Sequence, residues 1–162
     1  MNRRALARTS KTPGKTRACN VYAAGDRFYL VDLPGYGYAR IGKAERHGFS
    51  KLIGDYLSTR ENIAGVVWLL DIRRDPSPDD LVMANLLAAR GVPVLVAVTK
   101  ADKVSRSRRP ARISHILSAT GVPEDQCVVT SAQTREGTAE LQDSVLALVD
   151  EGGHAVGHSD GW

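Results

Sequence analysis

Short apolar runs alternate with segments of helical spacing along most of the chain. The first two runs, Ala18–Ala24 and Phe28–Leu33, flank the turn signal Gly25-Asp26 and predict an antiparallel hairpin. Aromatic and β-branched residues fill Phe28–Val31, a composition typical of a strand buried on both faces. The run stops at Asp32, so a carboxylate ends the strand.

The later runs continue this alternation. They predict strands at Ile63–Asp71, Val92–Val98 and Gln126–Thr130. Helices are predicted at Lys43–Arg60, from Asp79 or Asp80 to Arg90, at Ala111–Ala119 and at Thr138–Val149. Strands that alternate with helices imply parallel pairing and right-handed crossovers. The predicted fold is therefore a three-layer α/β sandwich with a mostly parallel sheet and an antiparallel edge hairpin.

Composition limits the class of protein. A length of 162 residues with 43% hydrophobic and 25% charged residues fits one globular domain, expected over residues 1–150. No apolar run reaches the roughly 18 residues of a membrane span. Cys19 and Cys127 lack metal-ligand spacing, which favours reduced, buried thiols in a cytoplasmic protein. The Gly- and His-rich tail, residues 151–162, is predicted to be disordered.

Asp32 opens the first candidate site. It stands at the carboxyl end of its strand, where open α/β sheets bind ligands, and Pro34 and Gly35 follow as chain breakers. In nucleotide hydrolases an Asp-x-x-Gly pattern places the carboxylate near Mg²⁺, usually through water, and the glycine amide near a terminal phosphate. The alternative interpretation is an ordinary turn.

Two further strands end in residues suited to a guanine base. Asp102, in Thr99–Asp102, can accept hydrogen bonds from the ring N–H and the exocyclic amine of guanine, which adenine does not offer. Lys100 can lay its alkyl stem over the base, and a backbone amide of Thr130–Ala132 can meet the guanine carbonyl. A solvated loop and a helix cap are the competing interpretations. The three strand ends, at Asp32, Thr99–Asp102 and Thr130–Ala132, are expected on one sheet.

These stretches together resemble known GTPase motifs. D-L-P-G at 32–35, T-K-A-D at 99–102 and T-S-A at 130–132 are similar to the switch, base-specificity and base-contact motifs of small GTPases. The chain resembles the EngB family of bacterial ribosome-assembly GTPases, of the TRAFAC class with Era and EngA, from Leu6 to Val149. The segments that carry this resemblance are Leu6–Thr16, Asp32–Ala39, Tyr56–Arg60 and Asp71–Asp80.

The resemblance implies a P-loop NTPase-type GTPase domain that binds GTP or GDP with Mg²⁺. It assigns Thr16 and Asp32 to the metal and Gly14–Thr16 to the first switch. Composition alone indicates that the basic start of the chain, Met1–Arg17, is a disordered tail. The implied GTP-binding residues are Gly14, Lys15, Thr16, Arg17, Ala18, Asp32, Leu33, Pro34, Gly35, Thr99, Lys100, Ala101, Asp102, Thr130, Ser131 and Ala132.

The implied partner is a large ribosomal subunit precursor or its rRNA, in a cytoplasmic monomer needed for normal cell division and septation. A net charge of +4 is compatible with an RNA-rich partner, although many enzymes share it. Arg106, Arg108, Arg109 and Arg112 could contact rRNA phosphates. The alternative, a solvated helix start, is favoured for these arginines.

The sequence departs from the GTPase pattern at the phosphate loop. Gly14-Lys15-Thr16 spells the ending of Gly-x-x-x-x-Gly-Lys-Thr, but Thr9 stands where the frame needs its first glycine. The chain is therefore expected to be truncated, lacking the first strand and the phosphate loop and leaving sheet edges uncovered. Such a chain is predicted to bind GTP weakly or not at all.

The sequence also departs from the GTPase pattern at a position used in catalysis. Tyr36 occupies the position where Ras-like enzymes carry a water-orienting glutamine, so hydrolysis is expected to be slow without a partner or a monovalent cation, and no catalytic residue can be named. A GTP-dependent switch is the leading interpretation. A non-catalytic fragment that binds a partner or RNA is the alternative, and an ATP-using kinase-like protein fits poorly because Asp102 favours guanine.

Overall fold

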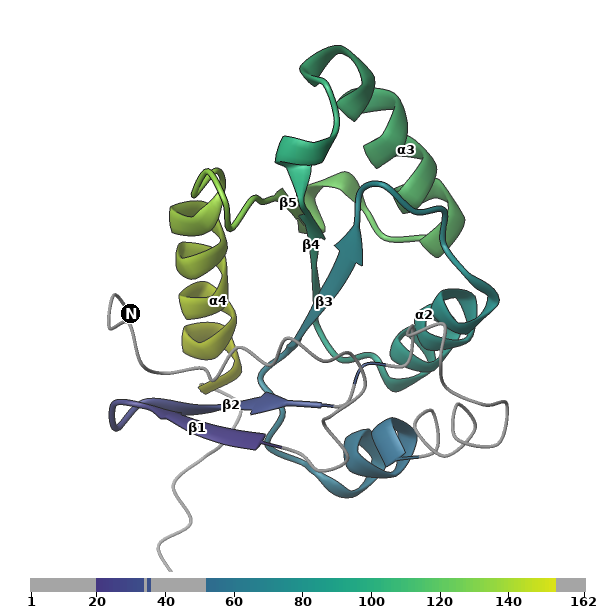
Figure 1. Ribbon diagram of the computed structural model, residues 1–162. Coiled ribbons are helices and arrows are strands. Elements are labelled where there is room, and N and C mark those ends of the chain that lie inside the picture. Colours follow the sequence, from purple (N-terminus) through teal and green to yellow (C-terminus); the bar gives the residue numbers. More distant parts are fainter. Residues whose placement is uncertain (1–19, 34, 36–51, 154–162) are drawn as a thin grey trace, which may run out of the picture. The chain divides into compact units, whose positions relative to one another are not determined.

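The computed structural model describes residues 20–33, 35 and 52–153, and the chain divides into two units, Met1–Ile53 and Gly54–Trp162. Figure 1 shows the elements of each unit. The expectations for residues 1–19 and 36–51, and for the tail 154–162, lie outside the described residues.

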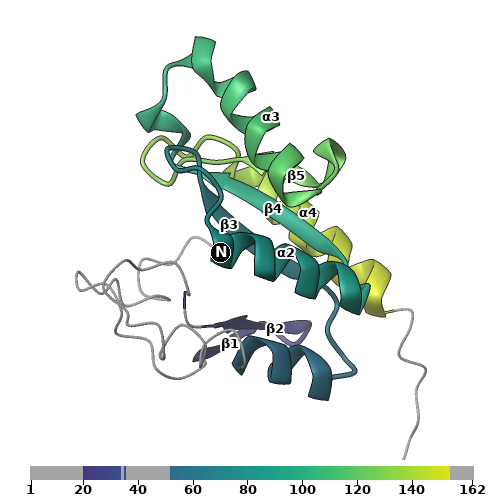
Figure 2. The ribbon, with the colours of Figure 1, turned by 90° about the vertical axis from the view of Figure 1, so that its right-hand side faces the viewer.

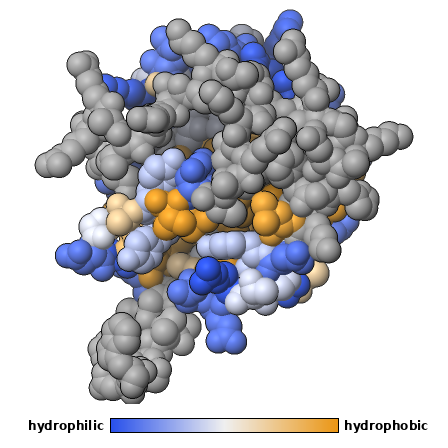
Figure 3. Space-filling view, turned by 60° about the horizontal axis from the view of Figure 1, so that its bottom comes forward, coloured by the Kyte–Doolittle hydropathy of each residue, from blue (hydrophilic) through white to orange (hydrophobic). Residues whose placement is uncertain are grey.

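The first unit contains the predicted hairpin. β1 (Asn20–Ala24) pairs antiparallel with β2 (Phe28–Asp32), with Val21 opposite Val31. The expectation that the second strand is buried on both faces is wrong, since Tyr29 is 70% exposed and Leu30 37%. Within the described part of this unit β2 has only β1 beside it, and a two-stranded ribbon cannot cover both of its faces. Figure 3 shows apolar residues at the surface of one face of the molecule.

The second unit contains a parallel sheet in the order β3-β4-β5, which confirms the parallel pairing. β3 spans Val66–Asp71, β4 spans Val94–Thr99 and β5 spans Cys127–Val129. The register places Asp71 directly beside Thr99, so the ends of β3 and β4 meet at one edge. In the described residues β2 pairs with β1 in a two-stranded sheet of its own, so the prediction of one common sheet for the three strand ends is wrong there.

Helices cover both faces of the three-stranded sheet. α2 (Pro78–Arg90) and α3 (Arg109–Thr120) lie on one face, and α4 (Thr138–Gly153) lies on the other (Figures 1 and 2). Short 3₁₀ turns join them: η1 (Ala101–Lys103), η2 (Arg106–Arg108) and η3 (Glu124–Gln126). Residues 52–59 are also helical. This arrangement confirms a three-layer α/β architecture for the second unit.

The helix ends differ from prediction for local reasons. α3 begins at Arg109, before the predicted Ala111, because Pro110 fits the first turn, where its missing N–H costs nothing. α2 begins with a capping box in which the Ser77 Oγ accepts from the Asp80 N–H and the Asp80 carboxylate accepts from the Ser77 N–H. α4 continues to Gly153, so the predicted tail overlaps its last turn.

The core of the second unit centres on β4. Val96, Ala97 and Val98 are fully buried, as the unbroken apolar run predicted. The core includes Trp68, Leu70, Ile72, Met83, Leu87, Leu95, Ile116, Leu117 and Val128. Cys127, expected in the core, is half-buried with a free thiol, and burial raises its pKa. A packed sheet therefore fixes the loops that leave the carboxyl ends of β4 and β5.

Candidate functional site

The loop after β4 has an unusual backbone at its first residue. Lys100 adopts φ 61°, in the left-handed region that non-glycine residues rarely enter, and η1 follows at once. The sheet ladder holds this turn, because the Ala101 N–H donates to the Thr130 carbonyl at 3.1 Å and the Ile72 N–H donates to the Thr99 carbonyl at 3.1 Å. A strained residue held by a rigid sheet edge is a common property of functional sites.

Asp102 is held in an ionised, acceptor-only state. The Ser131 hydroxyl donates to one carboxylate oxygen at 2.6 Å, and the Lys103 ammonium contacts the other at 3.0 Å. These partners, the Ser131 hydrogen bond first, hold the pKa of Asp102 below its usual range. A carboxylate has about four lone-pair positions, so two contacts leave room for further donors. The predicted base-recognition residue is thus oriented and able to accept.

Ser131 is the fixed point of the second loop. It is fully buried, its Oγ accepts from the Thr134 N–H at 3.2 Å, and its own N–H donates to the Glu136 carbonyl at 3.0 Å. The chain turns back at Gly137, with φ 67°, where a Cβ would lie 2.0 Å from the Val129 carbonyl oxygen. The sequence predicted a role only for the backbone amides around Ser131. The contact between the Ser131 hydroxyl and Asp102 was not predicted.

A carboxylate that the sequence did not assign to a site contacts Lys100. Asp71 accepts from the Lys100 ammonium at 2.8 Å and from the Arg73 guanidinium at 2.9 and 2.7 Å. From the sequence, Asp71 was identified only as the end of a predicted strand and as part of the stretch Asp71–Asp80. Its position at the end of a strand beside Thr99 was the signal that could have found it.

The basic stretch is divided between inward and outward arginines. Arg109 bonds the Glu136 carboxylate at 2.7 Å and the Val104 carbonyl at 3.0 Å, so it fastens one loop to the other. Arg112 donates to the Ile72 carbonyl at 3.0 Å and pairs with Asp75 at 2.6 Å. Arg106 and Arg108 are exposed in η2. Two of the four arginines, Arg109 and Arg112, therefore have structural partners within the protein.

The phosphate and metal residues are only partly described. Asp32 is exposed at the end of β2, with the Asn20 side-chain amide at 3.5 Å, and Leu33 and Gly35 follow it. The expected contacts Gly14, Lys15, Thr16, Arg17, Ala18 and Pro34 lie outside the described residues. Within the described ranges no group of three His, Cys, Asp or Glu side chains could hold a metal ion. Thr99, Lys100, Ala101, Asp102, Thr130, Ser131 and Ala132 are brought together; Asp32 lies in the other unit.

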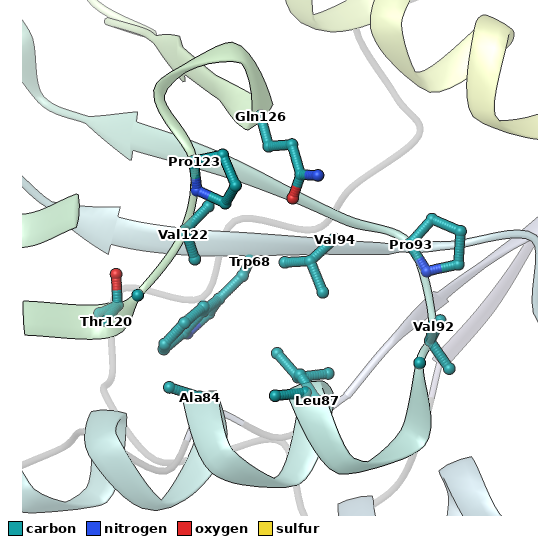
Figure 4. A pocket seen from close by; sticks show the side chains of 13 residues that line it. Trp68, Ala84, Leu87, Val92, Pro93, Val94, Thr120, Val122, Pro123 and Gln126 are labelled. Carbon is teal, nitrogen blue, oxygen red and sulfur yellow. The ribbon is translucent and has the colours of Figure 1, made fainter. Parts of the chain in front are cut away.

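An apolar cavity of about 440 Å³ lies between α2 and the residues before β5 (Figure 4). The Trp68 ring and Leu87 face it, and Val94, Val122 and Gln126 help to line it. Val94 begins β4, so this cavity is at the amino end of the sheet, opposite Thr99 and Thr130. It holds no ionisable side chain among its lining residues and is separate from the candidate base site.

Known proteins share this arrangement. A family model described as "50S ribosome-binding GTPase" matches residues 1–100. The crystal structure of a probable GTP-binding protein engB superimposes with a TM-score of 0.75 at 21% identity, covering 89% of this chain and 86% of that one. The FeoB G-domain from Methanococcus jannaschii gives 0.51 at 21% identity, with 82% and 79% coverage. The fold is therefore that of a P-loop GTPase domain.

Sequence relatives narrow the class. The probable GTP-binding protein EngB of Syntrophomonas wolfei is 45% identical over 148 residues, covering 91% of this chain and 76% of that protein. The EngB protein of Halothermothrix orenii is 44% identical over 153 residues, with coverage of 93% and 76%. The chain belongs to the EngB family of GTP-binding proteins, as the resemblance predicted. None of the helices in the described ranges has the length and apolar character to cross a membrane.

Proposed function

We propose that this chain binds guanine nucleotides, with the base recognised by Asp102, Lys100 and Ser131. The observation that carries the proposal is the Asp102 carboxylate, which Ser131 orients at 2.6 Å on the same loop edge as the strained Lys100. Thr99, Ala101, Thr130 and Ala132 complete the expected base-binding loops. Membership of a family of GTP-binding proteins supports the same assignment.

The chemistry of Asp102 explains the choice of base. Guanine presents a ring N–H and a 2-amino group side by side, and an ionised carboxylate can accept from both. Adenine lacks this pair of donors, so it would leave the carboxylate without them. Ser131 and then Lys103 hold the pKa of Asp102 below its usual range, so these contacts favour the ionised carboxylate. The Lys100 stem offers an apolar surface for one face of the base.

We propose that the phosphate end of the nucleotide, with Mg²⁺, is bound by Gly14–Ala18 and Asp32–Gly35. Carboxylate and hydroxyl oxygens suit this hard cation, which would supply positive charge to the phosphates when bound. Asp32 fits such a role because it is exposed and ends a strand. Of the two expected metal ligands, Asp32 lies within the described residues and Thr16 lies outside them.

We propose a large ribosomal subunit precursor as the partner, acting in the cytoplasm and in support of cell division. The matching family model is described by ribosome binding, and the chain carries a net charge of +4. Arg106 and Arg108 are the arginines of η2 whose side chains are exposed for rRNA phosphates. The nucleotide state would change this contact through the switch loops.

A second candidate is a non-catalytic module that binds a partner or RNA without productive GTP binding. The specific observation that favours it is the absence of a Gly-x-x-x-x-Gly-Lys-Ser/Thr frame from the printed sequence. Backbone amides of that loop make most of the phosphate contacts in related GTPases. Release of phosphate from GTP by the purified chain, measured with and without Mg²⁺, separates the two candidates.

Calorimetric titration tests base recognition. The chain is titrated with GDP and with ADP, and the Asp102→Asn and Asp125→Asn variants are run beside it. Asp125 is an exposed carboxylate in η3, so its variant is matched in charge but not in position. We expect GDP binding that exceeds ADP binding and is lost only in Asp102→Asn. Equal affinity for GDP and ADP contradicts the proposed function.

A further inference from the structure

Asp71 makes more contacts than the turn it begins requires. One carboxylate oxygen accepts from the Arg73 backbone N–H at 3.0 Å and from its Nε at 2.9 Å. The other accepts from the Arg73 Nη2 at 2.7 Å and from the Lys100 Nζ at 2.8 Å. The Asp71 side chain is only 14% exposed, whereas those of Arg73 and Lys100 are 44% and 53% exposed. A nearly enclosed carboxylate thus anchors two surface cations.

The sheet register brings Asp71 to Lys100 across 29 residues of sequence. Asp71 is the register partner of Thr99, and the Thr99 hydroxyl donates to the Leu70 carbonyl at 3.1 Å. The contact therefore depends on the rigid β3–β4 pair and not on a flexible loop. Arg73 holds the carboxylate in place through parallel hydrogen bonds, the geometry that makes such pairs directional.

Lys100 needs such an anchor. Its backbone is fixed by the left-handed turn, but a lysine side chain that is half exposed samples many rotamers unless its ammonium is held. Asp71 holds the ammonium at one end, and the strained backbone holds the other. The alkyl stem between them is then limited in direction before any ligand arrives.

We propose that Asp71 is a positioning residue for guanine binding, which holds the Lys100 ammonium so that the Lys100 stem is preorganised against the base accepted by Asp102. The inference rests on the proposed function, since it assigns a role at the same site. Asp71 contacts no base itself and acts through Lys100. Arg73 orients the Asp71 carboxylate through its two guanidinium hydrogen bonds.

Preorganisation of Lys100 should have a measurable effect on the affinity for guanine. Immobilising a side chain with many rotamers costs about 0.5–1.5 kcal/mol on binding, which corresponds to about 2- to 12-fold in affinity. Asp71→Asn removes the charge but keeps an oxygen for the Arg73 N–H, so the turn keeps its main backbone contact. Asp75→Asn is the matched control, because Asp75 lies in the same loop and pairs with Arg112 instead of Lys100.

The first readout needs no ligand. In the 162-residue chain, ¹⁵N relaxation of the lysine ammonium groups reports the order of Lys100, assigned by loss of its signal in Lys100→Arg. We expect this order to fall in Asp71→Asn and to persist in Asp75→Asn. Lys100 that stays equally ordered in Asp71→Asn overturns the inference, whatever the ligand measurements give.

The second readout separates the base from the phosphate. GMP and AMP carry the same phosphate, so the ratio of their affinities, measured by NMR titration, cancels the effect of removing a nearby negative charge. We expect the ratio to fall about 2- to 12-fold in Asp71→Asn. Lys100→Ala should lose at least as much, and Asp71→Asn combined with Lys100→Ala should lose nothing further, because coupled residues are not additive.

The outcomes distinguish the two levels of the account. A wild-type ratio that is unchanged in Asp71→Asn overturns the role of Asp71 alone. A wild-type chain that does not prefer GMP overturns both the proposed function and this role, even if Lys100 is mobilised by the substitution. Equal falls of the GMP-to-AMP affinity ratio in Asp71→Asn and Asp75→Asn also overturn the role of Asp71, since a general effect on the loop would then explain the result.

Discussion

Replacing Gly137 by alanine should damage the base site from outside it. The residue has φ 67°, where a side chain costs about 1–2 kcal/mol. The new Cβ would also lie 2.0 Å from the Val129 carbonyl oxygen, a backbone atom that cannot rotate away. Relieving such overpacking costs about 1–3 kcal/mol more. The expected loss of unfolding free energy is therefore about 2–5 kcal/mol.

Gly121→Ala is the matched control. Gly121 has φ 70°, the same strained region, but nothing lies within 4 Å of its Cβ position. Its loss should stay near the strain alone, about 1–2 kcal/mol. Urea unfolding followed by circular dichroism gives both values. The difference between the two variants isolates the contact with the Val129 carbonyl.

The Gly137 variant should also weaken guanine binding. Relief of the clash moves Glu136, whose carbonyl accepts from the Ser131 N–H at 3.0 Å, and Ser131 orients Asp102. GDP affinity should fall in Gly137→Ala and hold in Gly121→Ala. Equal stability of the two variants would refute the steric argument, and unchanged GDP affinity in a destabilised Gly137→Ala would refute the path to Asp102.

The remaining predictions concern a cap, a carboxylate and the surface. Ser77→Ala removes the hydroxyl that accepts from the Asp80 N–H and should cost about 1 kcal/mol in urea unfolding; no loss would contradict the capping box. Arg73, then Lys100, holds the pKa of Asp71 well below its usual range, so its contribution to stability is present above about pH 4 and is lost as pH falls further. Stability in Asp71→Asn, followed by thermal unfolding, should depend less steeply on pH below 4; an unchanged slope contradicts this. Removing Arg106 and Arg108 together should weaken binding to rRNA and flatten its salt dependence by up to about two ion contacts, measured by filter binding; an unchanged slope excludes both from the interface.

Local patterns predicted the elements that depend on local forces. The apolar run of β4 is buried as expected, and α2 ends at Arg90 as predicted, with Gly91 after it in the left-handed conformation. The sequence placed the start of α3 at Ala111, whereas the helix begins at Arg109 with Pro110 in its first turn. Propensity and caps therefore fix element type better than element ends.

Contacts between distant residues were not predictable in the same way. The pairing of Asp71 with Lys100 follows from the register of β3 and β4, which no single-strand pattern reveals. The inward direction of Arg109 likewise depends on where Glu136 arrives after β5. Exposure of Tyr29 in β2 was misjudged because burial depends on what covers a strand, not on its own composition.

Exchange of base specificity at position 102 tests whether Asp102 recognises guanine. Xanthine carries an oxygen where guanine carries its 2-amino group, so an asparagine at position 102, with one acceptor and one donor, matches it while a carboxylate does not. Calorimetry of the wild-type chain and Asp102→Asn with GDP and with xanthosine diphosphate measures all four affinities. We expect the wild type to prefer GDP and Asp102→Asn to prefer xanthosine diphosphate. Retention of the GDP preference in Asp102→Asn would contradict it.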